Sequence, residues 1–252
     1  MFNFFVSENF RTDDSYYISG VDYNHIKNVL RMKEGDTFLV SENGISNLCK
    51  IMAFENESVV ARIIEENYQS TELPVKIHLF QGLPKSDKLE LIIQKTAELG
   101  VFSITPTEMS RCIVKIEDKK KKSKLERWQA ISESAAKQSK RNIIPEIRNI
   151  VSFREALSET SSYDMILVPF ESEKGMESTK NALNEIKAGM DIAVFIGPEG
   201  GFDDKEIEAA KEQGAKILSL GKRILRTETA AITAVSLLML HTEMNLSEKN
   251  YD

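Results

Sequence analysis

Two short loops rich in glycine and positive charge are the residues best suited to hold a ligand. The first reads Gly-Pro-Glu-Gly-Gly at residues 197–201, and the second reads Leu-Gly-Lys-Arg-Ile-Leu-Arg at residues 220–226. Glycine lets a main chain approach a ligand closely and reach angles that other residues avoid. Lysine and arginine can hold a phosphate or stabilise an anion that forms during a reaction. The loops therefore predict a binding pocket with a positive edge.

The glycine pattern argues against two common nucleotide sites. No Gly-Lys-Ser or Gly-Lys-Thr follows the first loop, and its spacing is not the GxGxxG of dinucleotide-binding folds. No Ser-His-Asp order and no paired-carboxylate signature supports a hydrolase. The two cysteines and three histidines are scattered along the chain, so we expect neither a metal site nor a disulfide framework.

Both loops follow short apolar runs of strand character, at residues 192–196 and 217–220, and lead towards helical patterns. In an open α/β sheet, the loops beyond the carboxyl ends of neighbouring strands form the usual ligand crevice, so we expect one shared pocket. From residue 75 onward strands and amphipathic helices alternate, which predicts a mostly parallel sheet covered on both faces. The predicted strands are residues 75–81, 103–107, 165–169, 192–196 and 215–220, and the predicted helices are residues 87–99, 124–139, 153–158, 177–186, 204–213 and 228–243.

Polar residues and glycines mark the expected helix ends. Asp87 with Glu90 predicts a capping box, Asp203 or Asp204 is expected to cap the next helix, and Thr227 the last one. Gly100 and Gly214 stand where helices are expected to stop.

Residues 1–70 have a different pattern, with alternating or β-branched runs separated by turns and one short helix at residues 23–32. This predicts a small β-barrel-like domain at residues 1–70, followed by the α/β domain at residues 75–246. The apolar start of the chain is too short for a signal peptide, and no apolar run approaches membrane-spanning length. We therefore expect a cytoplasmic protein without membrane association.

Charge is distributed unevenly along the chain. The net charge is −6, yet residues 71–145 carry 15 basic and 9 acidic side chains. The run of residues 119–122 is all lysine, and farther on Lys137, Gln138 and Arg141 occupy neighbouring helical turns of the second domain. Such an arrangement suits phosphate contacts, so RNA or DNA binding is one interpretation and an ordinary solvated surface is the other.

Several stretches, together with the two loops, resemble the ribosomal RNA small-subunit methyltransferase E family of the SPOUT, or trefoil-knot, class. The resemblance covers nearly the whole chain, and the two loops are highly specific in combination. The chain departs from the family in having one histidine at Asn24-His25, where two are frequent, and Lys222, where proline is common. The matching stretches are HIKNVLRMKEGD at 25–36, QGLPKSDKLELIIQKTAELG at 81–100, Arg111-Cys112, Arg127-Trp128, ESAAKQSKRNIIP at 133–145, IGPEGGF at 196–202 and LGKRILRTET at 220–229.

The resemblance implies an N-terminal PUA-like β-barrel, a C-terminal knotted α/β domain and a homodimer with each active site near the subunit interface. It implies S-adenosylmethionine-dependent methylation of N3 of a uridine in 16S rRNA near the decoding centre, on the assembled small ribosomal subunit. Two alternatives remain open. A non-catalytic RNA-binding assembly factor would bind RNA but no cofactor, and an α/β enzyme for another nucleotide would transfer no methyl group.

Specific roles follow from the resemblance and the charges. Arg226 is expected to favour the uridine anion, and Glu199 to orient the base or take a proton, while the general base stays unassigned. Arg31, Arg111, Gln138 and Arg141 are expected to hold RNA. The expected cofactor-binding residues are Ile196, Gly197, Pro198, Glu199, Gly200, Gly201, Leu220, Gly221, Ile224, Leu225 and Arg226.

Overall fold

The structure is a computed structural model that describes residues 1–6, 10–173 and 175–246. The described residues form two compact units. The first takes in those of Met1–Glu72 and Ala136–Ile143, and the second those of Leu73–Ala135 and Ile144–Asp252. The segment Ala136–Ile143, assigned from sequence to the second domain, therefore packs with the N-terminal residues. The guanidinium of Arg141 pairs with Glu72, and the side-chain amide of Asn3 donates to the Arg141 carbonyl over 2.7 Å.

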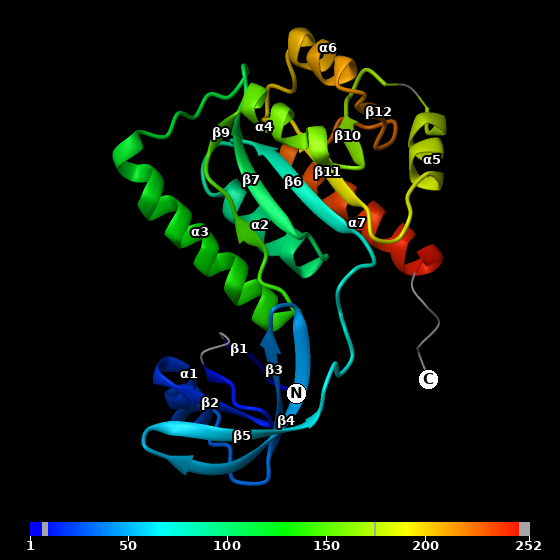
Figure 1. The fold of residues 1–252 in the computed structure, drawn as a ribbon. Coiled ribbons are helices and arrows are strands. Elements are labelled where there is room, and N and C mark those ends of the chain that lie inside the picture. Colours follow the sequence, from blue (N-terminus) through cyan, green and yellow to red (C-terminus); the bar gives the residue numbers. More distant parts are fainter. Residues whose placement is uncertain (7–9, 174, 247–252) are drawn as a thin grey trace. The chain divides into compact units, whose positions relative to one another are not determined.

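The first unit is built on a five-stranded sheet with the order β1-β3-β4-β5-β2 (Figure 1). All its pairs are antiparallel except β1 with β3. The expected helix at residues 23–32 is a short α1 (Gly20–Asn24) followed by a five-residue π-helix, η2 (His25–Val29). The strands are β1 (Asn3–Phe5), β2 (Ser15–Ser19), β3 (Thr37–Glu42), β4 (Ile45–Glu55) and β5 (Ser58–Glu65).

A parallel sheet forms the centre of the second unit, as the sequence predicts. Its main path has the order β12-β10-β11-β6-β7-β8, and β9 also pairs with β7. Every pair is parallel, so the carboxyl ends of the strands meet at one edge. The strands are β6 (Lys76–Gly82), β7 (Ser103–Glu108), β8 (Glu146–Ile147), β9 (Val151–Ser152), β10 (Met165–Pro169), β11 (Asp191–Ile196) and β12 (Lys216–Leu218).

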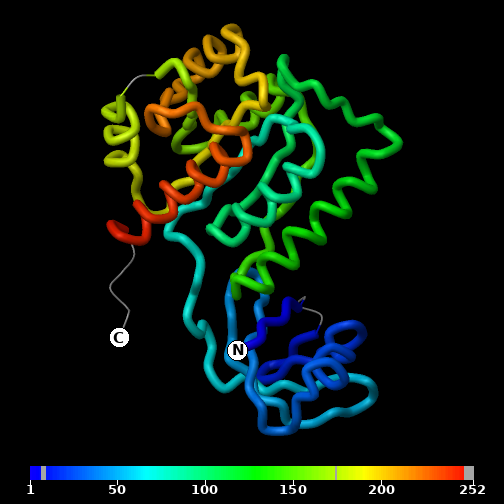
Figure 2. The backbone as a smooth tube through the Cα atoms, turned by 180° about the vertical axis from the view of Figure 1, so that it is seen from behind, coloured from blue at the N-terminus to red at the C-terminus, as the bar shows by residue number. Residues whose placement is uncertain are grey.

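Alternate side chains of these strands enter two separate apolar cores. On β11, Val194 belongs to a core shared with α2 (Lys88–Glu98) and α7 (Thr227–Leu246), whereas Phe195 belongs to a core shared with α4 (Phe153–Glu159) and α6 (Asp204–Glu212). Successive strand residues face opposite sides, so this sheet is buried on both faces. Figure 2 shows α2 and α7 lying side by side over one face. Other helices are α3 (Asp118–Gln138), whose last residues belong to the first unit, α5 (Glu177–Asn184) and a 3-10 helix, η3 (Thr160–Ser162).

Three expected helix-end residues are confirmed, and two expected caps, Asp87 and Thr227, are wrong, because the Thr227 hydroxyl bonds to Gln81 and Gly197 instead. Asp203 caps α6 in a capping box with Glu206, and Gly100 and Gly214 lie just beyond α2 and α6 with φ of 95° and 81°. Asp87 precedes α2 but makes no side-chain cap, because its φ of −89° and ψ of 14° are not extended. The partner expected for it, Glu90, instead accepts hydrogen bonds from Arg127.

Candidate functional site

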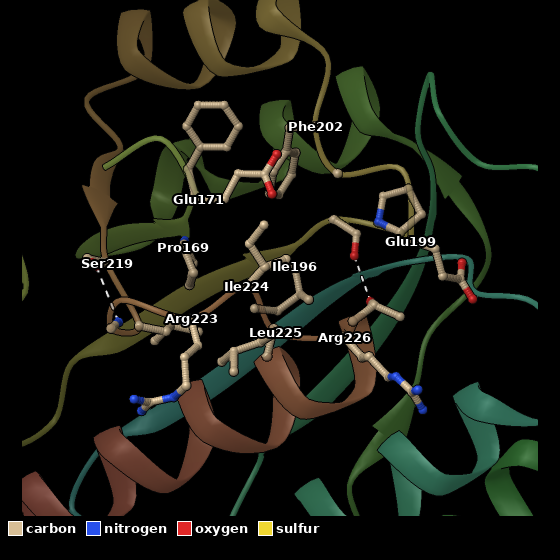
Figure 3. A pocket seen from close by; sticks show the side chains of 18 of the residues that line it. Pro169, Glu171, Ile196, Glu199, Phe202, Ser219, Arg223, Ile224, Leu225 and Arg226 are labelled. Carbon is tan, nitrogen blue, oxygen red and sulfur yellow. Dashed lines mark hydrogen bonds between the residues drawn. The ribbon is translucent and has the colours of Figure 1, made fainter. Parts of the chain in front are cut away.

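A cavity of about 350 Å³ opens where the carboxyl ends of β10, β11 and β12 meet. The segment after β11 forms one side, the segment between β12 and α7 forms another, and the end of β10 completes the wall (Figure 3). Ile196, Ile224 and Leu225 gather in the middle of this view. The predicted loops therefore share one pocket, and its apolar side chains and main-chain groups suit a small organic ligand.

Ten of the eleven residues expected to bind a cofactor line this cavity. The exception is Gly200, which lies in the same loop but faces Arg111: a Cβ there would lie 2.9 Å from the Arg111 Cβ. Sequence reasoning missed the contribution of β10, although its predicted carboxyl end stood at the same sheet edge. The other lining residues are Pro169, Phe170, Glu171, Phe202, Ser219, Lys222, Arg223, Thr227 and Ala230.

The first loop is fixed by close packing on β6. A Cβ on Gly82 would lie 2.6 Å from the Pro198 nitrogen, so only glycine leaves room for this approach. On the other side, Arg111 Nη1 donates to the Gly200 carbonyl over 3.2 Å. Gly82 therefore lets β6 pack closely against the first loop, and Gly200 lets the first loop pack closely against Arg111.

Glu199 ties the first loop to the start of α2. Its Oε1 accepts hydrogen bonds of 3.0 Å from both the Lys85 N–H and the Lys88 ammonium. Partial burial opposes ionisation of Glu199, but these hydrogen bonds outweigh it, and the pKa of Glu199 lies below its usual value. Lys88 Nζ also lies 3.4 Å from Glu228 Oε2 on α7. This lysine therefore joins the first loop to the helix that follows the second loop.

The second loop is held at both ends by buried hydroxyl groups. At its start, Thr179 Oγ1 donates to the Ser219 carbonyl over 2.7 Å and accepts from the Ser219 N–H over 3.1 Å. At its end, Thr227 Oγ1 donates to the Gly197 carbonyl over 2.6 Å and accepts from Gln81 Nε2 over 2.9 Å. Thr227 is also the first residue of α7. Its hydroxyl therefore links the end of the second loop to the first loop.

Three cations of the second loop give the cavity a positive edge. Within the described part of the chain, no carboxylate forms an ion pair with Lys222, Arg223 or Arg226. Figure 3 shows the Arg223 and Arg226 side chains pointing in different directions. Between them in sequence, Ile224 is 84% exposed. The edge can therefore receive an anion without first breaking an ion pair.

The residues expected to hold RNA lie in different environments. Arg31 is exposed, follows the π-helix and has a φ of 54°, and Gln138 is also exposed. Arg111 is exposed but bound to the first loop. Arg141 is only 3% exposed and pairs with Glu72, a position suited to holding residues 136–143 in the first unit.

The lysine run at residues 119–122 lies on the exposed first turns of α3. Lys119 and Lys120 lie near Glu117, and Lys121 lies 2.9 Å from Asp118. Exposed pairs of this kind contribute little stability and exchange readily for other partners.

A Ser-His-Asp cluster with a buried serine and histidine and a partly exposed aspartate lies at the amino ends of the strands. His78 Nδ1 lies 2.8 Å from Ser103 Oγ, and His78 Nε2 lies 2.8 Å from Asp191 Oδ1. The sequence did not predict this cluster, because its three residues are far apart along the chain. Ser103 has no exposed surface, so it cannot attack a substrate, and the cluster joins β6, β7 and β11.

The described residues offer neither a membrane-spanning helix nor a metal-binding cluster. None of their helices is long and apolar enough to cross a membrane. Their histidine, cysteine, aspartate and glutamate side chains form no group of three or more that could hold a metal ion.

Two family models match this chain. An RNA methyltransferase domain matches residues 71–239, and an RNA methyltransferase PUA domain matches residues 18–64. The ribosomal RNA small subunit methyltransferase E of Bacillus subtilis (strain 168) is 38% identical over 91% of each chain. The protein of that name from Mesomycoplasma hyopneumoniae (strain 232) is 34% identical over 92% of this chain and 96% of its own length.

A solved structure resembles the chain over both units. The ribosomal RNA small subunit methyltransferase E of Neisseria gonorrhoeae, crystallised with S-adenosyl methionine, matches with a TM-score of 0.80 and 30% identity. The match covers 95% of this chain and 97% of that one.

Proposed function

This chain belongs to the ribosomal RNA small subunit methyltransferase E family, and we propose on that premise that it methylates N3 of a uridine in 16S rRNA. The proposed methyl donor is S-adenosylmethionine, and the proposed substrate is the assembled small ribosomal subunit. The observation that carries the proposal is the cavity shared by the two glycine loops, with apolar walls and a positive edge for which the described residues supply no ion-pair partner.

The cavity fits this cofactor in size and chemistry. Its volume of about 350 Å³ lies within the range of small-molecule pockets. Ile196, Leu220 and Leu225 offer apolar surface for an aromatic base, and the glycine loops offer main-chain hydrogen-bonding groups. Glu171, at the end of β10, adds a carboxylate that can accept hydrogen bonds from hydroxyl or amino groups. When bound, S-adenosylmethionine supplies an electrophilic methyl carbon.

Arg226 and Glu199 have distinct proposed roles. Arg226 places a permanent positive charge where the uridine would lose its N3 proton, so it favours the anionic base without removing the proton. Glu199 orients the base or its loop through its carboxylate. Its pKa below the usual value makes it a weak proton acceptor at neutral pH.

RNA contacts are proposed for both units. The domain boundaries proposed from sequence, residues 1–70 and 75–246, assign RNA binding to the first domain and methyl transfer to the second. Arg31 and Gln138 are exposed and free to approach phosphates, and Arg111 lies beside the first loop. Arg141 is proposed to act indirectly, because its pairing with Glu72 holds the segment that carries Gln138.

A knotted chain and a homodimer complete the proposal. β12 lies at one end of the strand order, with β10 and β11 between it and β6. The chain then crosses back, because α7, which follows β12, packs against β6 and β11. Such a return path is compatible with a knot. On α7, Leu240 and Met244 are 49% and 74% exposed, which supports a subunit interface on that helix. The proposed location is the cytoplasm, where small ribosomal subunits function.

A methyl-transfer assay tests this function. Small subunits from a strain lacking the gene would be incubated with the protein and S-adenosylmethionine labelled in its methyl group, and the modified nucleotide mapped by mass spectrometry. We expect label at N3 of one uridine in 16S rRNA, and more on assembled subunits than on naked RNA. RNA binding without cofactor binding would favour an assembly factor instead, and label on another atom or RNA would overturn the assigned substrate.

A further inference from the structure

A buried hydrogen-bond chain connects β6 to both walls of the cavity. Gln81, at the carboxyl end of β6, has no exposed surface, and Thr227 is 5% exposed. Gln81 Nε2 donates to Thr227 Oγ1 over 2.9 Å, and Thr227 Oγ1 donates to the Gly197 carbonyl over 2.6 Å. Residues separated by 146 positions thus meet beside the cavity.

The direction of this chain is fixed by the chemistry of its members. A carbonyl oxygen only accepts, so the single hydroxyl proton of Thr227 must point to Gly197. The hydroxyl can then only accept from Gln81, which must present its NH₂ group. The second proton of that NH₂ goes to the Gly82 carbonyl over 2.9 Å, which is consistent with this amide orientation.

The remaining atom of Gln81 indicates why a glutamine stands there. Its Oε1 is buried, and no described residue donates to it. A buried acceptor without a donor costs stability, so an apolar residue of similar length would avoid that cost. The benefit of Gln81 therefore comes from its two N–H donors.

We propose that Gln81 and Thr227 are positioning residues that set the spacing of the two cofactor loops. Gly197 opens the first loop, and Thr227 directly follows the second, so one hydroxyl fixes both against the central strand. This inference rests on the proposed function, because it takes S-adenosylmethionine as the ligand of the cavity. Loss of either donor lets the loops move apart, and the cofactor must then restore their spacing when it binds.

Binding calorimetry with S-adenosylmethionine tests the proposal on the full-length protein. Thr227→Val removes the hydroxyl at nearly constant volume and should raise the cofactor Kd about 10-fold, as expected for one lost hydrogen bond. Thr227→Ser keeps the hydroxyl and should restore the affinity to within about 3-fold of the wild type. The control is Thr160→Val, which deletes a buried hydroxyl bonded to the Leu157 carbonyl away from the cavity and should leave the Kd unchanged.

Two variants at Gln81 separate positioning from a merely structural role. Gln81→Met removes the donors together with the unpartnered acceptor, so the Kd should rise about 10-fold while the thermal midpoint changes little. Gln81→Glu can donate to Thr227 only when protonated. Its cofactor affinity relative to the wild type should therefore improve as the pH falls from 8.5 to 6.

The outcomes distinguish this inference from the proposed function. An unchanged Kd in both Thr227→Val and Gln81→Met would overturn the positioning role while leaving the function intact. The positioning role would equally be wrong if Thr227→Ser bound the cofactor as weakly as Thr227→Val, or if affinity and stability fell in parallel. A wild-type protein that does not bind S-adenosylmethionine would overturn the proposed function, and the inference with it.

Discussion

Lys88 Nζ lies 3.0 Å from Glu199 Oε1, and this ion pair joins the first loop to the beginning of α2. Glu199 also accepts from the Lys85 N–H, so one carboxylate oxygen holds two donors from the segment after β6. The same contacts keep the pKa of Glu199 below its usual value. The residue is therefore charged at every pH where the enzyme would work, and its proposed role is to orient the base or the loop.

Glu199→Gln tests this role because it keeps the shape and removes the charge. Replacing a charge-assisted hydrogen bond by a neutral one costs roughly 1 kcal/mol, so the cofactor Kd should rise about 5-fold. The pH dependence of single-turnover methyl transfer between pH 6 and 9 should keep the wild-type form. An ionisation that disappears from this range in the variant would instead identify Glu199 as a proton acceptor.

Arg226→Ala should impair the chemical step much more than cofactor binding. Removing one donor that stabilises a developing anion lowers kcat about 100-fold or more in comparable sites. Single-turnover transfer from labelled cofactor measures the rate, and calorimetry measures the Kd. Arg223→Ala is the matched control, because it removes the same charge from the same loop while its side chain points elsewhere in Figure 3. Equal rates for the two variants would contradict the role of Arg226.

Gly82→Ala should displace the first loop. The new Cβ would lie 2.6 Å from the Pro198 nitrogen and 2.9 Å from the Met109 sulfur, and the backbone atom cannot yield as a flexible side chain can. We expect the cofactor Kd to rise at least about 10-fold, together with a loss of roughly 1–3 kcal/mol in stability. Gly189→Ala is the control: its φ of 84° strains the backbone, but no atom lies within 4 Å of the new Cβ, so it adds no steric contact. Similar Kd values for these two variants would count against the packing argument.

The parallel sheet and the two loops were predictable because their signals are local. Apolar runs and glycines mark the strand ends, and parallel strands place those ends at one edge. The contact of Gln81 with Thr227 was not predictable, since it depends on which strand lies beside the last helix. Thr227 illustrates the limit: its type and position indicated a helix start, but its hydroxyl donates to Gly197.

Packing between distant segments also explains what the sequence missed in the first unit. Residues 136–143 begin with the last residues of α3, most of which lies in the second unit, yet Arg141 pairs with Glu72 and the segment belongs with the N-terminal strands. Likewise, the apolar spacing at residues 23–32 indicated one helix, and the π-helix at His25–Val29 left no trace in that spacing. Both features arise from contacts or backbone geometry that residue periodicity does not encode.

Replacement of Lys119, Lys120, Lys121 and Lys122 by glutamine should weaken RNA binding and its dependence on salt. Their neighbours Glu117 and Asp118 form ion pairs with them at the surface, which phosphates can replace at little cost. Each lost phosphate contact lowers the slope of log K against log salt by about 0.7 to 0.9, so we expect a decrease of roughly 1–3. Filter binding to 16S rRNA at several salt concentrations measures it, and an unchanged slope would make this run ordinary surface.

Acid should destabilise the second unit through His78. Burial lowers the pKa of His78, and its hydrogen bond to Asp191 offsets only part of that effect. Below pH 6.5, the usual pKa, His78 therefore binds a proton more readily in the unfolded chain than in the folded chain. The contribution of neutral His78 to the free energy of unfolding is fully present above that pH and is lost as the pH falls. Carboxylates with lowered pKa values, such as Glu155, add their own loss only at more acidic pH.

His78→Gln should remove this part of the pH dependence. Trp128, the single tryptophan, is 4% exposed in the core of the same unit, so its fluorescence reports unfolding of the second unit. The variant should be less stable than the wild type at pH 7.5, because bonds to Ser103 and Asp191 are altered, and the gap should narrow towards pH 5. Thr160→Val deletes a buried hydroxyl that does not titrate, so its curve should run parallel to that of the wild type. A His78→Gln curve that also stays parallel would show that protonation of this histidine does not limit stability in acid.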